Sequence, residues 1–348
     1  HVRSRRQRQM CIRDSCHVVR LGVLDIGSNT VHLLVMDARV GGPPIPAASH
    51  KSQLRLAEHI EDDGSMSKKG ADALIEMVAS SREFAEDTGC SSLLPFVTSA
   101  LREATNCDDV IERCKKETGV ELRVLSGTDE SRLTFLSARR WYGWSAGTLG
   151  VFDIGGGSLE IAAGSDEEPH VALSVPLGAG RLTRDFGSSG NTKAMRRHAR
   201  TTIGSVIGDV LRVAPFDRTV GTSKTFRTLG RIAGAAPASE GPYVPRVLHR
   251  EALRDMVDRL DRTPVEQRAA LPGVSEGRAP QVLAGAVVAE AVMELAGIDH
   301  LDLCPWAVRE GVIVTYLDHL DFYTNGSPSA RALKPTPSPG LVLAETPV

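Results

Sequence analysis

The sequence predicts an α/β protein built from two similar lobes. A strand, a glycine-containing loop and a second strand occur in the first half, around Asp25-Ile26-Gly27-Ser28-Asn29-Thr30. The same order returns in the second half, around Asp153-Ile154-Gly155-Gly156-Gly157-Ser158. In both halves a third strand follows, and later strands alternate with segments of helical period. The length of 348 residues fits two domains of about 150 residues each, so we expect a duplicated fold.

The composition argues against several classes of function. The net charge of −2 gives no general affinity for nucleic acid or for a membrane surface, so we expect neither as a partner. A polyanionic ligand would have to be met by local basic groups and backbone amides. No apolar run approaches the roughly 20 residues that a membrane span needs. The six cysteines include no CxxC pair, which favours free thiols in a reducing compartment and therefore a cytoplasmic protein.

Both ends of the chain differ in composition from the rest. Residues 1–20 are rich in arginine and lack both apolar periodicity and the apolar core of a signal peptide. We expect them to be disordered or not native to the protein. Residues 323–348 are rich in proline and serine, which predicts a disordered tail. The folded part is therefore expected to span about residues 21–322.

The first lobe is expected over residues 21–135 and opens with a meander of three strands, as a ribonuclease-H-like lobe does. The expected strands are 21–25, 31–37, 49–58, 93–98 and 121–125. Helices are expected at 68–87, where Ser67 is a suitable N-cap, at 108–118 and at 131–140. Arg102 is expected to begin a helix at the carboxyl end of strand 93–98, where open α/β sheets usually bind ligands.

The second lobe, expected over residues 136–307, repeats this opening. Its expected strands are 148–153, 159–163, 169–176, 216–220 and 300–304. Its expected helices are 193–211, 226–233, 250–260, 264–271 and 281–295. A closing helix at 308–322 could pack back on the first lobe.

The two glycine loops predict phosphate binding. Glycine allows a tight turn and a close approach of backbone N–H groups to a ligand, and successive N–H groups form an anion-binding concavity. An aspartate before each turn, Asp25 or Asp153, is well placed to hold a divalent cation or a water. A third loop at Thr222, Ser223 and Lys224 precedes a helix and could also cradle phosphate. No Walker A motif is present.

Four other residues have both an ordinary structural interpretation and a functional one. Asp129 and Glu130 begin a helix, where acidic residues usually compensate the helix dipole, yet they lie between the two glycine loops. Arg102 could be a surface arginine in a helical ion pair. His32, inside an apolar strand, is more often a core residue than a ligand.

Five motifs occur in an order that resembles one known family. They are Asp-Ile-Gly-Ser-Asn-Thr, Thr-Ser-Ala-Leu-Arg-Glu-Ala, Leu-Ser-Gly-Thr-Asp-Glu-Ser-Arg-Leu, Asp-Ile-Gly-Gly-Gly-Ser-Leu-Glu and Trp-Ala-Val-Arg-Glu-Gly. Together they resemble the exopolyphosphatase/guanosine pentaphosphate phosphohydrolase (Ppx/GppA) family, and most closely its short actinobacterial exopolyphosphatases. The resemblance implies two ribonuclease-H-like lobes of the actin/hexokinase/Hsp70-like superfamily around a central cleft. It also implies a requirement for Mg²⁺ and a homodimer.

The resemblance assigns roles to individual residues. Glu130 takes the place of the general base, within Asp129-Glu130-Ser131 where the family usually has Glu-Glu-Ala. Asp153, Gly155 and Glu160 match functional positions of the second loop. The expected catalytic residues are Glu130, Asp153 and Glu160. The expected phosphate-binding residues are Gly27, Ser28, Asn29, Thr30, Arg102, Gly155, Gly156, Gly157, Ser158, Thr222, Ser223 and Lys224. The candidate Mg²⁺ ligands are Asp25, Asp153 and Glu160, because Mg²⁺ prefers a few carboxylates with waters and substrate phosphates.

The function expected from this set is an exopolyphosphatase. It would hydrolyse the terminal phosphoanhydride of linear inorganic polyphosphate and release orthophosphate, through general-base activation of water. A guanosine pentaphosphate (pppGpp) 5′-phosphohydrolase is the alternative within the same chemistry. A sugar or acetate kinase and a non-catalytic phosphate or nucleotide sensor are less favoured. Basic residues could guide the polyanion or simply form a solvated helix face; these are Arg181, Lys193, Arg196 and Arg197.

Overall fold

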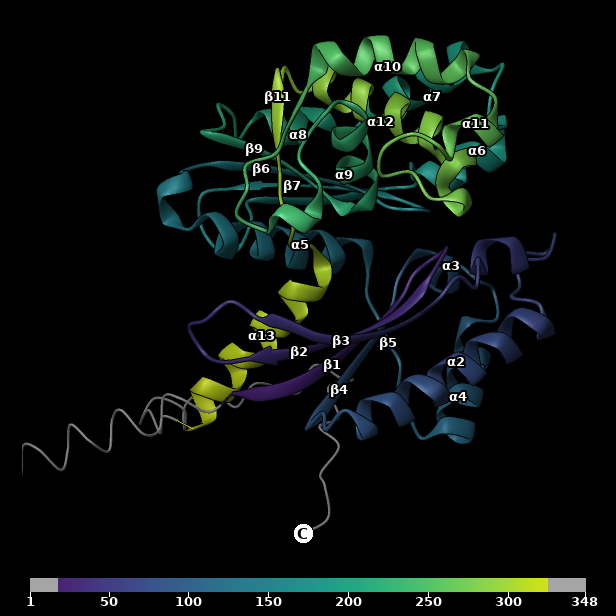
Figure 1. Cartoon of the computed structure of the whole chain (residues 1–348), viewed down its shortest axis with the longest axis vertical. Coiled ribbons are helices and arrows are strands. Elements are labelled where there is room, and N and C mark those ends of the chain that lie inside the picture. Colours follow the sequence, from purple (N-terminus) through teal and green to yellow (C-terminus); the bar gives the residue numbers. More distant parts are fainter. Residues whose placement is uncertain (1–17, 325–348) are drawn as a thin grey trace, which may run out of the picture. The chain divides into compact units, whose positions relative to one another are not determined.

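The computed structural model describes residues 18–324 and divides the chain into two compact units (Figure 1). The first unit runs to Val124 and resumes at Val312, and the second is Leu125–Gly311. The expectations for residues 1–17 and 325–348 lie outside the described residues. The folded part is longer at both ends than expected, because Val19 and Arg20 belong to the first strand and residues 323 and 324 to the last helix.

The first unit contains a five-stranded sheet in the order β3-β2-β1-β4-β5. Its strands are β1 (Val19–Ile26), β2 (Val31–Ala38), β3 (Ile45–Ser52), β4 (Ser92–Val97) and β5 (Arg123–Val124). The meander β1-β2-β3 is antiparallel, whereas β4 and β5 join it in parallel. The helical elements are η1 (Leu56–His59), α2 (Lys68–Asp87), α3 (Ser99–Arg102), α4 (Cys107–Thr118) and the greater part of α13 (Val308–Thr324).

The second unit contains a six-stranded sheet in the order β10-β11-β9-β6-β7-β8. Its strands are β6 (Leu149–Ile154), β7 (Leu159–Gly164), β8 (Val171–Val175), β9 (Arg218–Thr222), β10 (Val247–His249) and β11 (His300–Leu303). Its α-helices are α5 (Gly127–Tyr142), α6 (Ala179–Phe186), α7 (Thr192–Gly204), α8 (Ile207–Leu211), α9 (Ser223–Ile232), α10 (Arg250–Arg262), α11 (Val265–Arg268) and α12 (Val282–Leu295). Short 3₁₀ turns are η2 (Trp144–Ala146), η3 (Ala238–Glu240) and η4 (Glu276–Gln281).

The two sheets share one plan, which confirms the expected duplication. Each begins with an antiparallel meander, and the fourth strand pairs in parallel with the first strand of that meander. The loops at Gly27 and Gly155 join the first two strands of each meander. In both units the glycine N–H donates to the carbonyl three residues on, at 3.0 Å for Gly27 to Thr30 and 2.9 Å for Gly155 to Ser158.

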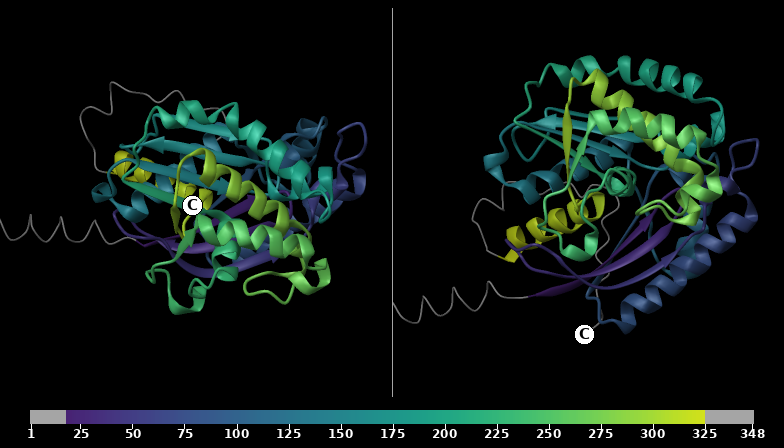
Figure 2. Two further views of the ribbon diagram at one scale, coloured as in Figure 1. Left: turned by 90° about the horizontal axis from the view of Figure 1, so that it is seen from above. Right: turned by 45° about the horizontal axis from the view of Figure 1, so that its top comes forward.

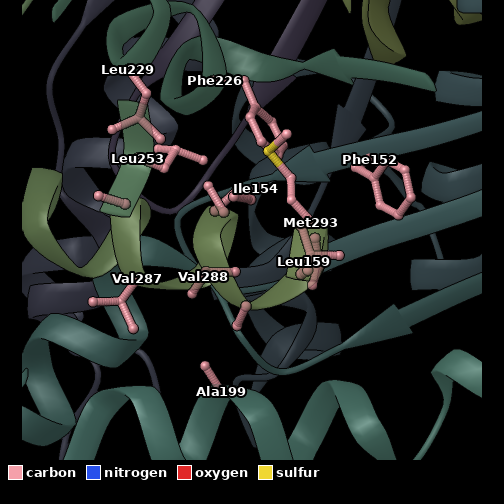
Figure 3. Packing of buried hydrophobic residues seen from close by; sticks show 14 of the residues in the cluster. Phe152, Ile154, Leu159, Ala199, Phe226, Leu229, Leu253, Val287, Val288 and Met293 are labelled. Atoms are coloured by element: carbon pink, nitrogen blue, oxygen red, sulfur yellow. The ribbon is translucent and has the colours of Figure 1, made fainter. Parts of the chain in front are cut away.

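The core of the second unit fixes the strand that carries the second loop. Phe152 and Ile154 alternate with Asp153 along β6, so they point to the opposite face of the sheet. There they join a fully buried cluster with Phe226 of α9 and Met293 of α12 (Figure 3). Helices α7, α10 and α12 lie over this face, and α5 covers the other (Figures 1 and 2). Asp153 therefore points to the face on which α5 packs.

The structure differs from the expected elements at several places. The third strand is Ile45–Ser52 and not 49–58, because Arg55 adopts a left-handed conformation and starts η1. Arg102 ends the short helix α3 and does not begin one. The expected helix 193–211 is two helices, α7 and α8. Helix α6 and strand β10 were not expected.

The division between the units falls at Val124/Leu125, before the boundary expected at 135/136. Helix α5 packs on β6, β7 and β8 of the second sheet, and the Ser131 hydroxyl donates to the Ile161 carbonyl at 3.1 Å. The first turns of α5 therefore belong with the second unit. In the first unit, Tyr316 of α13 hydrogen-bonds Ser92 of β4 at 3.0 Å. None of the described helices is both long and apolar enough to cross a bilayer.

Candidate active site

Four polar residues form a row across neighbouring strands of the second sheet. Thr222 of β9 is in register with Asp153 of β6, and Asp153 with Glu160 of β7. Glu160 is in turn in register with Ser174 of β8. Residues in register point to the same face of a sheet, so all four side chains face α5. The row crosses β6 just before the Gly155–Ser158 loop.

Glu160 is an acid in an unfavourable environment. Its side chain is 2% exposed. Burial, followed by the nearby Glu130 and Asp153, raises the pKa of Glu160 well above its ordinary value. Hydrogen bonds from the Ser158 and Ser174 side chains act in the opposite direction, with Ser174 Oγ 2.9 Å from Glu160 Oε1. Three carboxyl groups thus gather at one end of the strands.

Helix α5 contributes Glu130 to this group. The N-cap of α5 is Ser126, whose hydroxyl accepts from the Asp129 N–H at 3.0 Å. The same hydroxyl donates to the Asp129 carboxylate at 2.7 Å. Asp129 therefore supports the cap that Ser126 forms, and it lies in the first turn of the helix, where an acid also compensates the helix dipole. Glu130, the next residue, is the member of the pair that lies near Glu160.

The third loop is held in a conformation that non-glycine residues rarely adopt. Ser223 has φ 72°, and its buried hydroxyl has no hydrogen-bond partner among the described residues. Thr222 Oγ1 donates to the Trp306 carbonyl at 2.6 Å. Thr225 Oγ1 donates to the Ile154 carbonyl at 2.7 Å, which ties the start of α9 to the end of β6. Lys224 is exposed.

Two arginines that the sequence analysis did not single out lie near Asp153. Arg227 of α9 donates to the carbonyls of Ser223 and Pro305, at 3.1 Å each. Burial and then Arg309 lower the pKa of Arg227, while Glu310 and Asp153 raise it. Burial and then Arg227 lower the pKa of Arg278 in η4 to about 10, and Asp153 opposes that shift. The sequence could have indicated Arg227 as a site residue, because it follows the third loop by one helical turn. No pattern near Arg278 in the sequence indicates that it lies close to Asp153.

Two of the four basic residues proposed as a guide for a polyanion have other partners. Arg196 of α7 bonds Glu290 at 2.8 Å and Asp258 at 3.1 Å, so it ties α7 to α12 and α10. Arg181 of α6 donates to the Gly157 carbonyl at 2.8 Å. Lys193 and Arg197 are exposed on α7.

The first unit holds its glycine loop in a similar way. The buried Ser28 hydroxyl lies 2.7 Å from the Ser99 hydroxyl, at the start of α3. The Thr98 N–H donates to the Ile26 carbonyl at 3.0 Å, joining the ends of β4 and β1. Asp25 pairs in register with His32, the position that corresponds to Glu160 in the second meander. Arg102 lies one helical turn after Thr98, and its N–H donates to the Thr98 carbonyl at 3.2 Å.

The expected site residues therefore fall into two groups. Asp25, the Gly27–Thr30 loop and Arg102 belong to the first unit, and the remaining expected residues belong to the second. Within the described residues no group of three or more His, Cys, Asp and Glu side chains is arranged to hold a metal ion. Asp153 and Glu160 nevertheless fit a hard divalent cation, since the two carboxyl groups lie opposite each other in register and repel, and a cation would offset that repulsion. Waters and substrate phosphates would have to complete such a site.

The fold and the site together define an actin-like α/β protein with two glycine loops and a cluster of carboxyl groups, an arrangement suited to phosphoryl transfer. The model of the Ppx/GppA phosphatase family matches residues 35–320, and the chain belongs to that family. An exopolyphosphatase 1 of Mycobacterium tuberculosis is 51% identical over 306 residues, covering 86% of this chain and 89% of that protein.

Two further comparisons extend this result. A guanosine-5′-triphosphate,3′-diphosphate pyrophosphatase of Vibrio parahaemolyticus is 26% identical, covering 85% of this chain but 59% of that protein. The crystal structure of an exopolyphosphatase from Cytophaga hutchinsonii covers 86% of this chain and 98% of its own, with a TM-score of 0.77 at 23% identity. That structural likeness confirms the expected fold class.

Proposed function

We propose that this protein is an exopolyphosphatase that releases orthophosphate from the end of linear inorganic polyphosphate. The observation that carries the proposal is the placement of Glu130 beside Glu160 and Asp153, at the strand ends next to the Gly155–Ser158 loop. The 51% identity to a mycobacterial exopolyphosphatase 1 over most of both chains supports the same substrate.

Each group has a part in the proposed reaction. Glu130 accepts the proton of the attacking water and orients that water in line with the terminal phosphorus. The N–H groups of the loop hold the equatorial oxygens of the terminal phosphate. Asp153 and Glu160 would hold Mg²⁺, which when bound neutralises charge on the phosphate oxygens. Asp25 of the first unit is the third candidate ligand.

We also assign Arg227 and Arg278 to the neutralisation of substrate charge in the second unit. Asp153 raises the pKa of both guanidinium groups. Arg227 lowers the pKa of Arg278, because two guanidinium groups repel. A phosphate chain carries enough negative charge to relieve this repulsion. In the first unit, Ser28, Asn29 and Arg102 have the corresponding phosphate-binding part in the proposal. A homodimer in the cytoplasm completes the proposal and rests on the family resemblance and on the lack of a CxxC pair in the sequence.

A pppGpp 5′-phosphohydrolase is the second candidate. The relative from Vibrio parahaemolyticus supports it, but at 26% identity and over 59% of that longer protein. The chemistry at the terminal phosphate would be the same. A non-catalytic sensor is less favoured because Glu130, Asp153 and Glu160 are all present and lie together.

The deciding experiment is release of orthophosphate from polyphosphates of several lengths, from pppGpp and from ATP, each with and without Mg²⁺. We expect Mg²⁺-dependent release that is fastest from polyphosphate. The E130Q variant should lose about 10²–10⁴-fold in kcat while still binding substrate. Turnover of E130Q near that of the wild type would refute the assignment of the base. Much faster hydrolysis of pppGpp than of every polyphosphate would favour the second candidate.

A further inference from the structure

The segment Leu177-Gly178-Ala179-Gly180-Arg181 lies directly against the glycine loop of the second unit. It directly follows the strand expected at 169–176, and Arg181 was expected as a possible cation that guides a polyanion. In the structure, β8 ends at Val175 and Ala179 begins helix α6. The N-terminal turn of this helix faces the carbonyl groups of the loop and not open solvent.

Three consecutive loop carbonyls accept hydrogen bonds from this turn. The Ala179 N–H donates to the Gly155 carbonyl at 3.0 Å, and the Arg181 N–H donates to the Gly156 carbonyl at 2.9 Å. The Arg181 side chain donates from Nε to the Gly157 carbonyl at 2.8 Å. The first N–H groups of a helix have no partner within the helix, so these donors are available without loss of helical bonds.

The contact is close enough to require glycine at the start of α6. A Cβ on Gly178 would lie 2.4 Å from the carbonyl carbon of Gly156 and 2.5 Å from that of Gly157. A Cβ on Gly180 would lie 3.0 Å from the Gly156 oxygen. The turn of α6 therefore determines where the backbone of the loop can lie.

The orientation of the carbonyls also fixes the N–H groups of the loop. In a planar trans peptide, the C=O of one residue and the N–H of the next point in opposite directions. Because the carbonyls of Gly155, Gly156 and Gly157 point at α6, the N–H groups of Gly156, Gly157 and Ser158 point away from it. Among residues 18–324, none of these three N–H groups donates to a backbone carbonyl of the surrounding loops and turns. They are thus directed as a group of donors toward a ligand.

We propose that Gly178–Arg181 is the positioning segment of the phosphate loop, and that Arg181 acts through the Gly157 carbonyl. Arg181 is then a positioning residue and not a cation that guides polyphosphate to the site. The proposal deepens the proposed function, on which its kinetic arm rests. It predicts that the geometry of the Arg181 side chain matters more than its charge.

The kinetic test separates geometry from charge. R181K keeps the charge but loses the Nε–H that reaches Gly157, and R181Q also removes the charge. We expect both variants to lose about tenfold or more in kcat/KM for polyphosphate, less than direct loss of an anion-stabilising donor costs. The slope of log kcat/KM against log salt concentration should be unchanged in both, since no substrate contact is removed. R184K, an exposed arginine on the same helix, is the matched control and should behave as the wild type.

A third variant removes one backbone donor. Ala179 is the first residue of α6, where proline is tolerated because that N–H has no partner in the helix. Gly178 before it is extended, with φ −89° and ψ 158°, as a residue before proline prefers. A179P therefore deletes the bond to the Gly155 carbonyl while leaving α6 intact. We expect it to lose activity as the Arg181 variants do.

A second readout needs no substrate. Amide hydrogen exchange should accelerate about tenfold or more at Gly155, whose N–H donates to the Ser158 carbonyl, and at residue 181, whose N–H donates to the Gly156 carbonyl. We expect this in R181K, R181Q and A179P but not in R184K, because a loop that has lost one of its hydrogen bonds to α6 opens more often. Unchanged exchange in all three variants overturns the proposal even if the wild type proves active. Wild-type activity in R181K, with a shallower salt slope in R181Q, overturns it in favour of a guiding cation. A wild type inactive on every polyphosphate refutes the proposed function, and the exchange measurement still decides the positioning role.

Discussion

Asp153 of β6 and Glu160 of β7 lie directly opposite each other in an antiparallel strand pair, with Glu160 almost fully buried. Like charges in such a pair destabilise a sheet. Glu130 adds a third acid at the same place. Such an arrangement is expected where function, and not stability, has determined the residues.

The first prediction concerns the stability cost of this pair. E160Q should raise the melting temperature of metal-free protein at pH 8, because it removes a buried negative charge beside Asp153. The folded state holds the Glu160 proton more tightly than the unfolded state does, because the folded pKa is raised. The stability of the wild type relative to E160Q therefore falls as pH rises. The fall begins at the unfolded pKa of about 4.3 and ends above the raised folded pKa. Thermal denaturation with EDTA at pH 5 and at pH 8 measures this. A larger gain from E160Q at pH 5 than at pH 8 would contradict it.

The second prediction separates Asp129 from Glu130. D129N should keep activity close to that of the wild type, because an amide oxygen can still accept the Ser126 hydroxyl. S126A should cost about 1 kcal/mol of stability through loss of the N-cap, without a comparable loss of kcat. Only E130Q should lose catalysis. Steady-state kinetics and thermal denaturation of the three variants provide the check. A large loss of kcat in D129N would contradict the assignment of Glu130 alone as the base.

The third prediction concerns the left-handed Ser223. S223G should raise the melting temperature by about 2–4 °C, because relief of roughly 1 kcal/mol of backbone strain is not offset by any lost hydrogen bond. S223V should destabilise the protein, since a branched side chain is disfavoured at this φ. Activity should fall in both variants if the hydroxyl binds phosphate. Lower stability of S223G than of wild type would show that the hydroxyl has a structural partner.

The fourth prediction concerns Arg278. With a pKa of about 10 the guanidinium is charged at pH 7.5, so it can bind phosphate there. R278Q should raise KM for polyphosphate about 10–100-fold, as loss of a charged hydrogen bond does, with a smaller effect on kcat. R212Q provides the control, because Arg212 is an exposed arginine paired with Asp209. An unchanged KM would remove Arg278 from the proposed site.

The sequence predicted the parts of the fold that depend on local patterns. Helix α2 has the expected bounds, because the Ser67 cap and the apolar period act within the segment itself. The first two strands of each meander also lie where expected. The third strand was displaced because Arg55 takes a left-handed conformation that no local residue preference indicates.

The sequence by itself determined that the chain has two glycine loops, each preceded by an aspartate, within a duplicated α/β plan. It did so because tight turns and strand alternation leave signals within a few residues. Only the tertiary structure decided that Arg227 and Arg278 lie near Asp153, that Arg196 is paired with Glu290, and that Arg181 holds the glycine loop. These relations join residues far apart in the chain, so the packing of helices on the sheet determines them and no local pattern could.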